Sequence, residues 1–400
     1  MDYITEPERK TPVTGEYDTV VVGGGIAGIA AAVSAARGGA KVLLTEKQYL
    51  LGGLATAGLV TIFLPLCDGL GRQVTFGVAE ELLRLSIRNG YEGKYPSAWL
   101  SGGTAAEKTK QRFEVQYNPY VFAIEAEKLL VAAGVDILFG TSVCGASVRD
   151  GKIQYIVTEN KSGRTAFALK NVIDCSGDAD VCKLSNENTV VFSQGNVPAS
   201  WYYYVENGEN RLKMLGFSDI PDSQKTAEQL KNAKNSLRFT GTAADELSRL
   251  TLYSHSVLLD DFLKKGNDTP RYSLSSIATV PQIRMTRRID GKYTQDDTEA
   301  HTEYPDSVGL FSDWRKPGPV YELPFSTLCG KKISNLLVAG RCISVTDAMW
   351  DITRVIPVCA LSGGAAGTAA AMTDNFDGID VAALQNRLKM SGVILHEGDL

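Results

Sequence analysis

The sequence has no long apolar run, no cysteine pairs of the kind that bind metals and no excess of positive charge. Seven cysteines are scattered through 400 residues without a Cys-x-x-Cys pair or a Cys/His cluster, so we expect neither a disulfide framework nor a metal site. No uninterrupted stretch of about 18 apolar residues occurs, which excludes a membrane-spanning helix. The formal net charge of −5 provides no basic field for nucleic acid or anionic lipid.

The remaining composition is typical of a globular protein, with 44% hydrophobic and 22% charged residues. Residues 1–16 are polar and lack the apolar stretch of a secretory signal. We therefore predict a cytoplasmic protein that binds a small-molecule substrate, without nucleic-acid or membrane partners. A homo-oligomer is compatible with the sequence, which contains nothing that fixes the oligomeric state.

The clearest local pattern lies near the N-terminus. Residues 17–22 form a short valine-rich run that is typical of a buried parallel strand. Residues 26–37 are rich in alanine and predict a helix that ends at Gly38, and residues 40–46 predict a second strand. A strand, a tight turn, a helix and a strand form a βαβ unit, which implies a parallel sheet with helices on its faces.

Similar signals recur on both sides of a middle region of different character. A helical pattern occurs within 69–90, and further helices are predicted at 119–133 and 358–372. Further strands are predicted at 135–139, 145–149, 153–158, 172–175 and 336–339. Between them, helical patterns are fewer and polar linkers are common. We predict a discontinuous cofactor-binding domain over 17–184 and 328–400, and a substrate or cap domain over 185–327.

Gly23, Gly25 and Gly28 form a GxGxxG motif directly after the first strand and at the start of the helix. The first glycine permits a tight turn, the second lets the backbone approach a pyrophosphate, and the third allows the helix to close on the strand. Glu46, at the end of the second strand, is placed to accept hydrogen bonds from an adenosine ribose and disfavours a 2′-phosphate. This element predicts a bound dinucleotide and leaves the choice between NAD and FAD open.

Several later segments bear on that choice. They are the glycine-rich stretches at 52–58, 174–180, 337–341 and 363–367, and the stretches 281–291, 321–325 and 353–359. The last three resemble the RExRRxxG, YEIPY-like and RVMPTC segments of the FAD-dependent oxidoreductase family, which is related to the glutathione-reductase superfamily. The likeness covers nearly the whole chain, with two departures. Met285 stands where members commonly have Glu, and Asp347 where many have His.

The resemblance implies an α/β fold with a Rossmann-type, glutathione-reductase-like FAD-binding domain and a smaller, strand-rich substrate domain. It also implies FAD as cofactor and an enzyme that transfers hydride between a small-molecule substrate and flavin N5. Glu46 and the first glycines would hold the ADP half. The full set of implied cofactor-binding residues is Gly23, Gly25, Ile26, Ala27, Gly28, Glu46, Lys47, Gly52, Gly53, Leu54, Ala55, Val143, Ser176, Gly177, Asp178, Gly340, Arg341, Arg354, Val355, Ile356, Gly363 and Gly364.

Three residues are candidates for a catalytic role. Arg287, with Arg284 and Arg288, is suited to anchor a carboxylate, and the alternative is that these arginines fix FAD or pair between domains. Arg354 is a candidate substrate anchor or proton relay beside the flavin. Cys67 is a candidate redox partner or covalent flavin attachment, although a buried, inert thiol is the commoner fate of a lone cysteine.

Other functions remain open at this level. A flavin monooxygenase would activate oxygen and usually consume a nicotinamide, and the sequence lacks a second GxGxxG motif for one. An FAD-stabilised accessory protein would bind flavin without turnover. A plain NAD-dependent dehydrogenase is disfavoured by the glycine-rich segment near the C-terminus.

Overall fold

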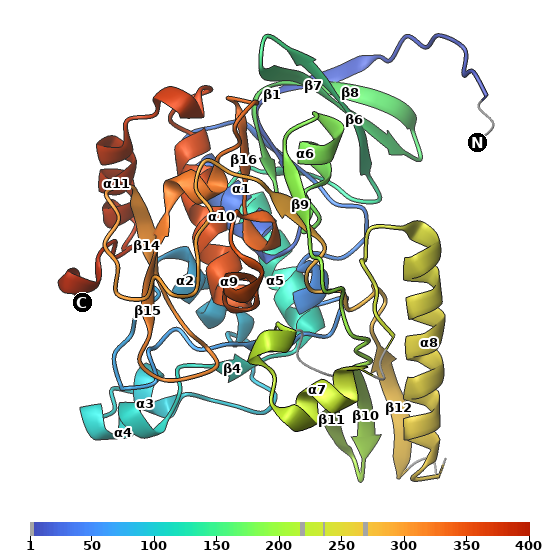
Figure 1. Ribbon diagram of the computed structural model, residues 1–400, viewed down its shortest axis with the longest axis vertical. Helices are drawn as coiled ribbons and strands as arrows, with labels where there is room; N and C mark the ends of the chain where they lie inside the picture. Colours follow the sequence, from blue (N-terminus) through green and yellow to red (C-terminus); the bar gives the residue numbers. More distant parts are fainter. Residues whose placement is uncertain (1–3, 217–220, 235–236, 267–270) are drawn as a thin grey trace.

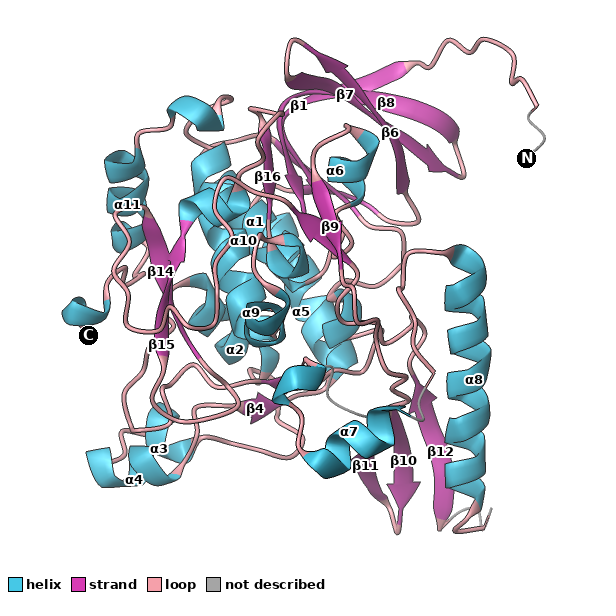
Figure 2. Ribbon diagram, viewed as in Figure 1, coloured by secondary structure: helices cyan, strands magenta, loops and turns pink. Residues whose placement is uncertain are grey.

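The largest sheet of the described residues has seven strands. Several of them are seen in the upper part of the views in Figures 1 and 2. The computed structural model describes residues 4–216, 221–234, 237–266 and 271–400. The strand order is β5-β2-β1-β8-β7-β6, and β16 pairs with β8. These strands are β1 (Val13–Val22), β2 (Val42–Thr45), β5 (Asp136–Leu138), β6 (Ser142–Arg149), β7 (Lys152–Asn160), β8 (Gly163–Asp174) and β16 (Leu336–Val338).

The parallel part of the sheet is the buried part. β1 pairs in parallel with β2 and β8, and its last four residues, 19–22, are all buried. β5 and β16 extend the parallel array, while β6 and β7 form an antiparallel hairpin that turns at Asp150 and Gly151. Strands covered on both faces read as continuous apolar runs, which is why this part of the sheet was readable from the sequence.

Helices α1 (Ile26–Arg37) and α10 (Ile356–Ala370) cross at unusually close range. A Cβ atom built on Gly363 would lie 2.3 Å from the carbonyl oxygen of Ala27, and one on Gly367 would lie 2.1 Å from that of Ala31. Glycine and alanine along both helices therefore allow their backbones to touch. Helices α2 (Val78–Ser86) and α5 (Pro119–Ala132) complete this layer.

A separate lobe is built from the middle of the chain. Strands β10 (Tyr202–Glu206), β11 (Glu209–Lys213) and β12 (Tyr272–Ile277) form an antiparallel sheet that packs beside α8 (Ala244–Leu263). The lobe has a small core of its own, which consists of Tyr202, Tyr204, Leu258, Phe262 and Tyr272. The strand-rich character expected for this region is confirmed, whereas its longest helix, α8, was not anticipated.

The remaining elements are short. The hairpin of β14 (Ser307–Ser312) and β15 (Val320–Pro324) packs with α10 and α11 (Val381–Met390). The other strands and helices are β3 (Ile62–Phe63), α3 (Ser97–Leu100), α4 (Ala105–Lys110), β4 (Val115–Gln116), α6 (Asp180–Leu184), β9 (Thr189–Val191), α7 (Ala227–Lys234), β13 (Arg287–Ile289) and α9 (Asp347–Thr353).

The predicted bounds of α1, 26–37, are confirmed. The helical pattern within 69–90 yields a helix only at 78–86, because positive φ angles at Gly69, Gly71 and Gly77 keep the preceding segment irregular. Among the described residues, no helix combines the length and the apolar character needed to cross a membrane. The division into domains at 184/185 and 327/328 stays a prediction.

Candidate functional site

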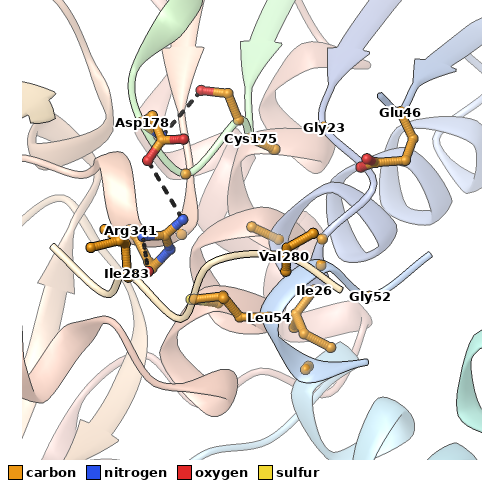
Figure 3. A pocket seen from close by; sticks show the side chains of 18 of the residues that line it. Gly23, Ile26, Glu46, Gly52, Leu54, Cys175, Asp178, Val280, Ile283 and Arg341 are labelled. Carbon is orange, nitrogen blue, oxygen red and sulfur yellow. Dashed lines mark hydrogen bonds and ion pairs between the residues drawn. The ribbon is translucent and has the colours of Figure 1, made fainter. Parts of the chain in front are cut away.

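A cavity of about 560 Å³ opens at the carboxyl ends of the parallel strands. The ends of β1, β2, β8 and β16 contribute residues to its wall, together with the N-termini of α1 and α10. Figure 3 shows how Glu46, Gly52, Leu54 and Arg341 surround this space from different segments. The carboxyl edge of an open parallel sheet is the position where α/β proteins bind ligands.

The three glycines of the turn after β1, at positions 23, 25 and 28, are each required for a different steric reason. Gly23 has a φ of +100°, and a Cβ atom there would lie 2.5 Å from the Cys175 carbonyl oxygen. A Cβ atom on Gly28 would lie 1.8 Å from the carbonyl oxygen of Gly23, so this glycine lets α1 close on the strand. A Cβ atom on Gly25 would meet nothing within 4 Å. Gly25 lines the cavity and thus leaves room for a ligand to touch the backbone.

Glu46 is fixed at the end of β2 by two backbone groups. Its Oε2 accepts a hydrogen bond from the Gly24 N–H at 2.7 Å, and its Oε1 accepts one from the Gln48 N–H at 2.7 Å. The carboxylate lines the cavity in this single orientation. A carboxylate held in this way is suited to accept hydrogen bonds from ligand hydroxyl groups.

Two helices begin at the cavity wall. α1 starts after Gly25 and α10 after Val355, and neither N-cap residue forms a side-chain capping bond. Ile26 and Ala27 of α1 and Val355 and Ile356 of α10 all line the cavity. Free N–H groups and the positive end of each helix dipole therefore face the space, which favours phosphates or another developing negative charge.

The loop after β8 is organised by Asp174. This fully buried carboxylate accepts hydrogen bonds from the backbone N–H groups of Ser176, Val181 and Cys182, and from the Ser176 hydroxyl. Burial raises the pKa of Asp174, and the hydrogen bonds oppose that shift. The network fixes the turn that brings Ser176, Gly177 and Asp178 to the cavity wall.

Hydrogen bonds connect this turn and the neighbouring Arg341 to the segment around residue 285. The Thr286 hydroxyl donates to Asp178 Oδ1 at 2.7 Å, and Arg341 Nη1 donates to the Arg284 carbonyl oxygen at 2.8 Å. Arg341 Nη2 lies 3.7 Å from Asp178 Oδ1. Asp180 also lines the cavity, and its pKa is raised to about 6, first by burial and then by Asp178 and Asp174.

The lobe forms part of the cavity wall. The Thr279 N–H donates to the Ala57 carbonyl oxygen at 2.8 Å, and the hydroxyl groups of Tyr203 and Thr61 lie 2.7 Å apart. These bonds attach the lobe to the loop that follows Gly53. The lobe and the segment after it contribute the lining residues Gly241, Leu247, Thr279, Val280, Pro281, Ile283 and Arg284.

The structure brings together most of the residues expected to bind the cofactor. All of them line the cavity except Gly28, Gly363 and Gly364, which pack against Gly23, Ala27 and Val78 instead. The prediction missed the lining residues from 241–284, apart from the arginine-rich stretch after Pro281. No local motif marks them, because the lobe acquires its position only from tertiary contacts with the loop at 57–61.

The candidate catalytic residues have different environments. Arg354 lines the cavity, and its Nε donates to Asp351 Oδ1 at 3.1 Å. Arg287 lies outside the cavity lining and pairs with Asp180 at 2.8 Å. Cys67 also lies outside the lining, where burial raises the pKa of its thiol.

Two neighbouring groups are also engaged by protein partners. Asp351 is fully buried between Arg354 and Arg315. Arg288 lies over the Trp350 ring, with 5.6 Å between the guanidinium carbon and the ring centroid, and its Nη2 is 3.9 Å from Asp347. Of the arginines considered as carboxylate anchors in 284–288, only Arg284 lines the cavity.

Comparison with known proteins agrees with these features. A family model described as FAD dependent oxidoreductase matches residues 18–388. A thioredoxin reductase of Ureaplasma parvum serovar 3 is 34% identical over 101 residues, which cover 23% of this chain and 33% of that protein. The chain therefore matches only about a third of the length of this curated relative.

Two solved structures illustrate the structural likeness. A geranylgeranyl bacteriochlorophyll reductase-like protein from Thermoplasma acidophilum shares 15% identity, with 94% of this chain and 83% of that chain covered and a TM-score of 0.48. The p-nitrophenol 4-monooxygenase of Pseudomonas putida DLL-E4 shares 11% identity, with 94% and 81% covered and a TM-score of 0.48.

Proposed function

Because the chain belongs to the FAD-dependent oxidoreductase family, we propose that this enzyme transfers hydride between a small-molecule substrate and N5 of its FAD. One observation carries the proposal. The same cavity is lined by the glycine turn after β1 and by apolar and cationic side chains of the lobe, of the segment after it and of the turn that precedes α10. A cofactor and a substrate can therefore meet in one cavity.

We propose that the nucleotide part of FAD lies along the glycine turn. Gly25 leaves the backbone open to a pyrophosphate, and the N-terminus of α1 provides N–H groups for it. Glu46, held by Gly24 and Gln48, would bind the ribose hydroxyls. The N-terminus of α10, at Val355 and Ile356, would face the flavin. When bound, FAD supplies the two-electron chemistry.

The chain itself contributes a cation, Arg354, that is held in a fixed orientation at the cavity wall. Arg354 donates hydrogen bonds from its Nε and Nη2 to Asp351 Oδ1. Its Nη1 has no partner among the described residues. Val60, Ile62 and Leu64, which follow the glycine loop in sequence, contribute apolar side chains to the same cavity. This arrangement supports a substrate that presents an anionic or carbonyl oxygen to Arg354.

The test is anaerobic reduction of the purified protein. After heat release has identified FAD, the protein is mixed with a panel of small acids, alcohols and amines while the absorption of oxidised flavin is followed. We expect one chemical class to bleach the flavin directly. The Arg354→Gln variant should retain FAD but be reduced at least tenfold more slowly, about 1.4 kcal/mol in barrier height. Arg72→Gln, a change at an arginine outside the cavity, is the control.

Other outcomes would assign a different function. Reduction that requires a nicotinamide, followed by oxygen-dependent hydroxylation, would identify a flavin monooxygenase. Flavin that binds stoichiometrically and is reduced by no member of the panel or by nicotinamides would favour the accessory role. Equal rates for Arg354→Gln and wild type would remove Arg354 from the mechanism.

A further inference from the structure

Helix α8 carries apolar side chains on two faces. One face buries Leu250, Leu258 and Phe262 against the rest of the protein. A helix at the surface of a globular protein normally presents one apolar stripe to the core and polar residues to solvent. In Figure 1, α8 lies at the edge of the molecule, with the lobe strands on one side of it only. The second apolar face therefore requires its own explanation.

That second face consists of Leu252, Leu259 and Leu263, which are 70%, 49% and 47% exposed. Their spacing of seven and four residues places them within about 40° of one another around the helix axis. Ser248 and Ser256 lie in the same row and are exposed as well. A narrow row of leucines at this spacing, with small residues between them, is the seam by which two helices pair.

We propose that α8 pairs with α8 of a second copy of this chain, antiparallel and about a twofold axis near residue 255. With this axis, Leu252 lies beside Leu259 of the partner subunit, and Leu263 lies beside Ser248 of the partner subunit. Each contact occurs twice, as a twofold interface demands. This assignment is independent of the function proposed above, because none of these side chains lines the cavity.

Charge complementarity selects a second copy over an unrelated partner. Arg249 and Asp260 are both exposed, and their spacing of eleven residues places them on the same flank of the leucine row. No described residue forms an ion pair with either side chain, and Arg249 interacts with Glu246 of its own helix only at longer range. Antiparallel pairing brings Arg249 beside Asp260 of the partner subunit, and the reciprocal pair forms at the other end. The two helix dipoles are then also opposed, which is favourable.

Sedimentation velocity of the full-length, FAD-loaded protein tests the proposal. We expect a dimer at micromolar concentration, and we expect Leu252→Glu and Leu259→Glu each to raise its dissociation constant at least tenfold. Ile124→Glu is the matched control, because Ile124 is 51% exposed on a different helix, α5. Retained flavin absorption in each variant shows that it is folded.

Charge reversal makes the register itself testable. Arg249→Asp and Asp260→Arg should each weaken the dimer, whereas the double variant should restore it. A wild-type protein that stays monomeric up to about 100 µM would overturn the proposal. The proposal would also be overturned if the Leu252→Glu variant had the same dimer dissociation constant as the Ile124→Glu control. Failure of the double variant to recover would rule out the antiparallel register.

Discussion

Asp180 is a carboxyl group whose ionisation opposes folding. Its pKa is raised from 3.8 to about 6, by burial and by neighbouring Asp178 and Asp174, although Arg287 pairs with it. Between these two values the folded protein binds more protons than the unfolded chain. The contribution of Asp180 to the free energy of unfolding therefore falls as the pH rises through this window. We expect Asp180→Asn to abolish that fall.

Urea unfolding of both proteins between about pH 4 and about pH 7 measures this effect. The stability of Asp180→Asn relative to wild type should rise up to about pH 6 and then level off. Glu107→Gln gives the opposite control, because hydrogen bonds from the Thr104 backbone and hydroxyl lower the pKa of Glu107. The stability from Glu107 is lost as the pH falls through that lowered pKa. Parallel curves for Asp180→Asn and wild type would contradict the prediction.

A substitution at Asp351 tests whether this residue serves the cavity as well as the stability of the fold. It is fully buried between Arg354 and Arg315, so Asp351→Asn leaves two cations short of a partner and should cost about 3 kcal/mol of unfolding free energy. Because Arg354 lines the cavity, flavin reduction by substrate should also slow. Asp313→Asn is the control, since Asp313 is buried and binds Arg315 at 2.9 Å without contacting Arg354. Stopped-flow reduction that slows equally in both variants would show that only stability is involved.

The single residues that could be predicted are those whose role is local. Gly23, Gly25 and Glu46 lie in the turn and at the strand ends, and their spacing alone predicts their place in the cavity wall. The partners of Arg287 and Arg354 could not be predicted in the same way. Asp180 lies 107 residues from Arg287 in sequence, and whether an arginine faces a cavity or a carboxylate is decided by tertiary packing.

Two glycines at helices α1 and α10 allow a role in helix packing to be distinguished from a role in ligand binding. Gly363→Ala would place a methyl group 2.3 Å from the Ala27 carbonyl oxygen, so we expect a loss of about 1–3 kcal/mol despite the higher helix propensity of alanine. Gly25→Ala meets nothing within 4 Å and has a φ of −69°. It should change the free energy of unfolding of the FAD-free protein by less than about 0.5 kcal/mol and yet weaken FAD binding.

Thermal unfolding and FAD titration of the two variants distinguish these effects. The expected result is a lower melting temperature for Gly363→Ala, and for Gly25→Ala an FAD dissociation constant at least tenfold higher without an intrinsic loss of stability. Unchanged FAD affinity in Gly25→Ala would mean that the pyrophosphate lies elsewhere in the cavity.

Helices differed in how well the sequence revealed them. α1 was predicted at its observed bounds because a strand, three glycines and an alanine-rich segment follow one another without interruption. α8 was missed, although it spans 20 residues. Its leucines point both into the lobe and out to solvent, which obscures the single apolar stripe that identifies an amphipathic helix.

In the molecule as a whole, apolar packing is unevenly divided. One large cluster joins the sheet, α1 and α10 with residues from the middle of the chain, such as Phe192, Met285 and Tyr321. The lobe of β10–β12 and α8 has only small clusters, around Tyr202 and around Phe239. Local opening free energies follow such differences, because fewer buried contacts hold the smaller unit. We therefore expect the lobe to open before the sheet and α10 do.

Hydrogen exchange followed by mass spectrometry measures this order in the FAD-loaded protein. Amides of β10, β12 and α8 should exchange through a lower-energy opening than those of β1, β8 and α10. Tyr203→Phe removes the hydroxyl that bonds Thr61, a loss of about 1 kcal/mol, and it should speed exchange in the lobe while leaving β1 unchanged. Dilution below the dissociation constant of the α8 pair should add to exchange in α8 alone. Uniform exchange across lobe and sheet would instead show that the chain opens as one cooperative unit.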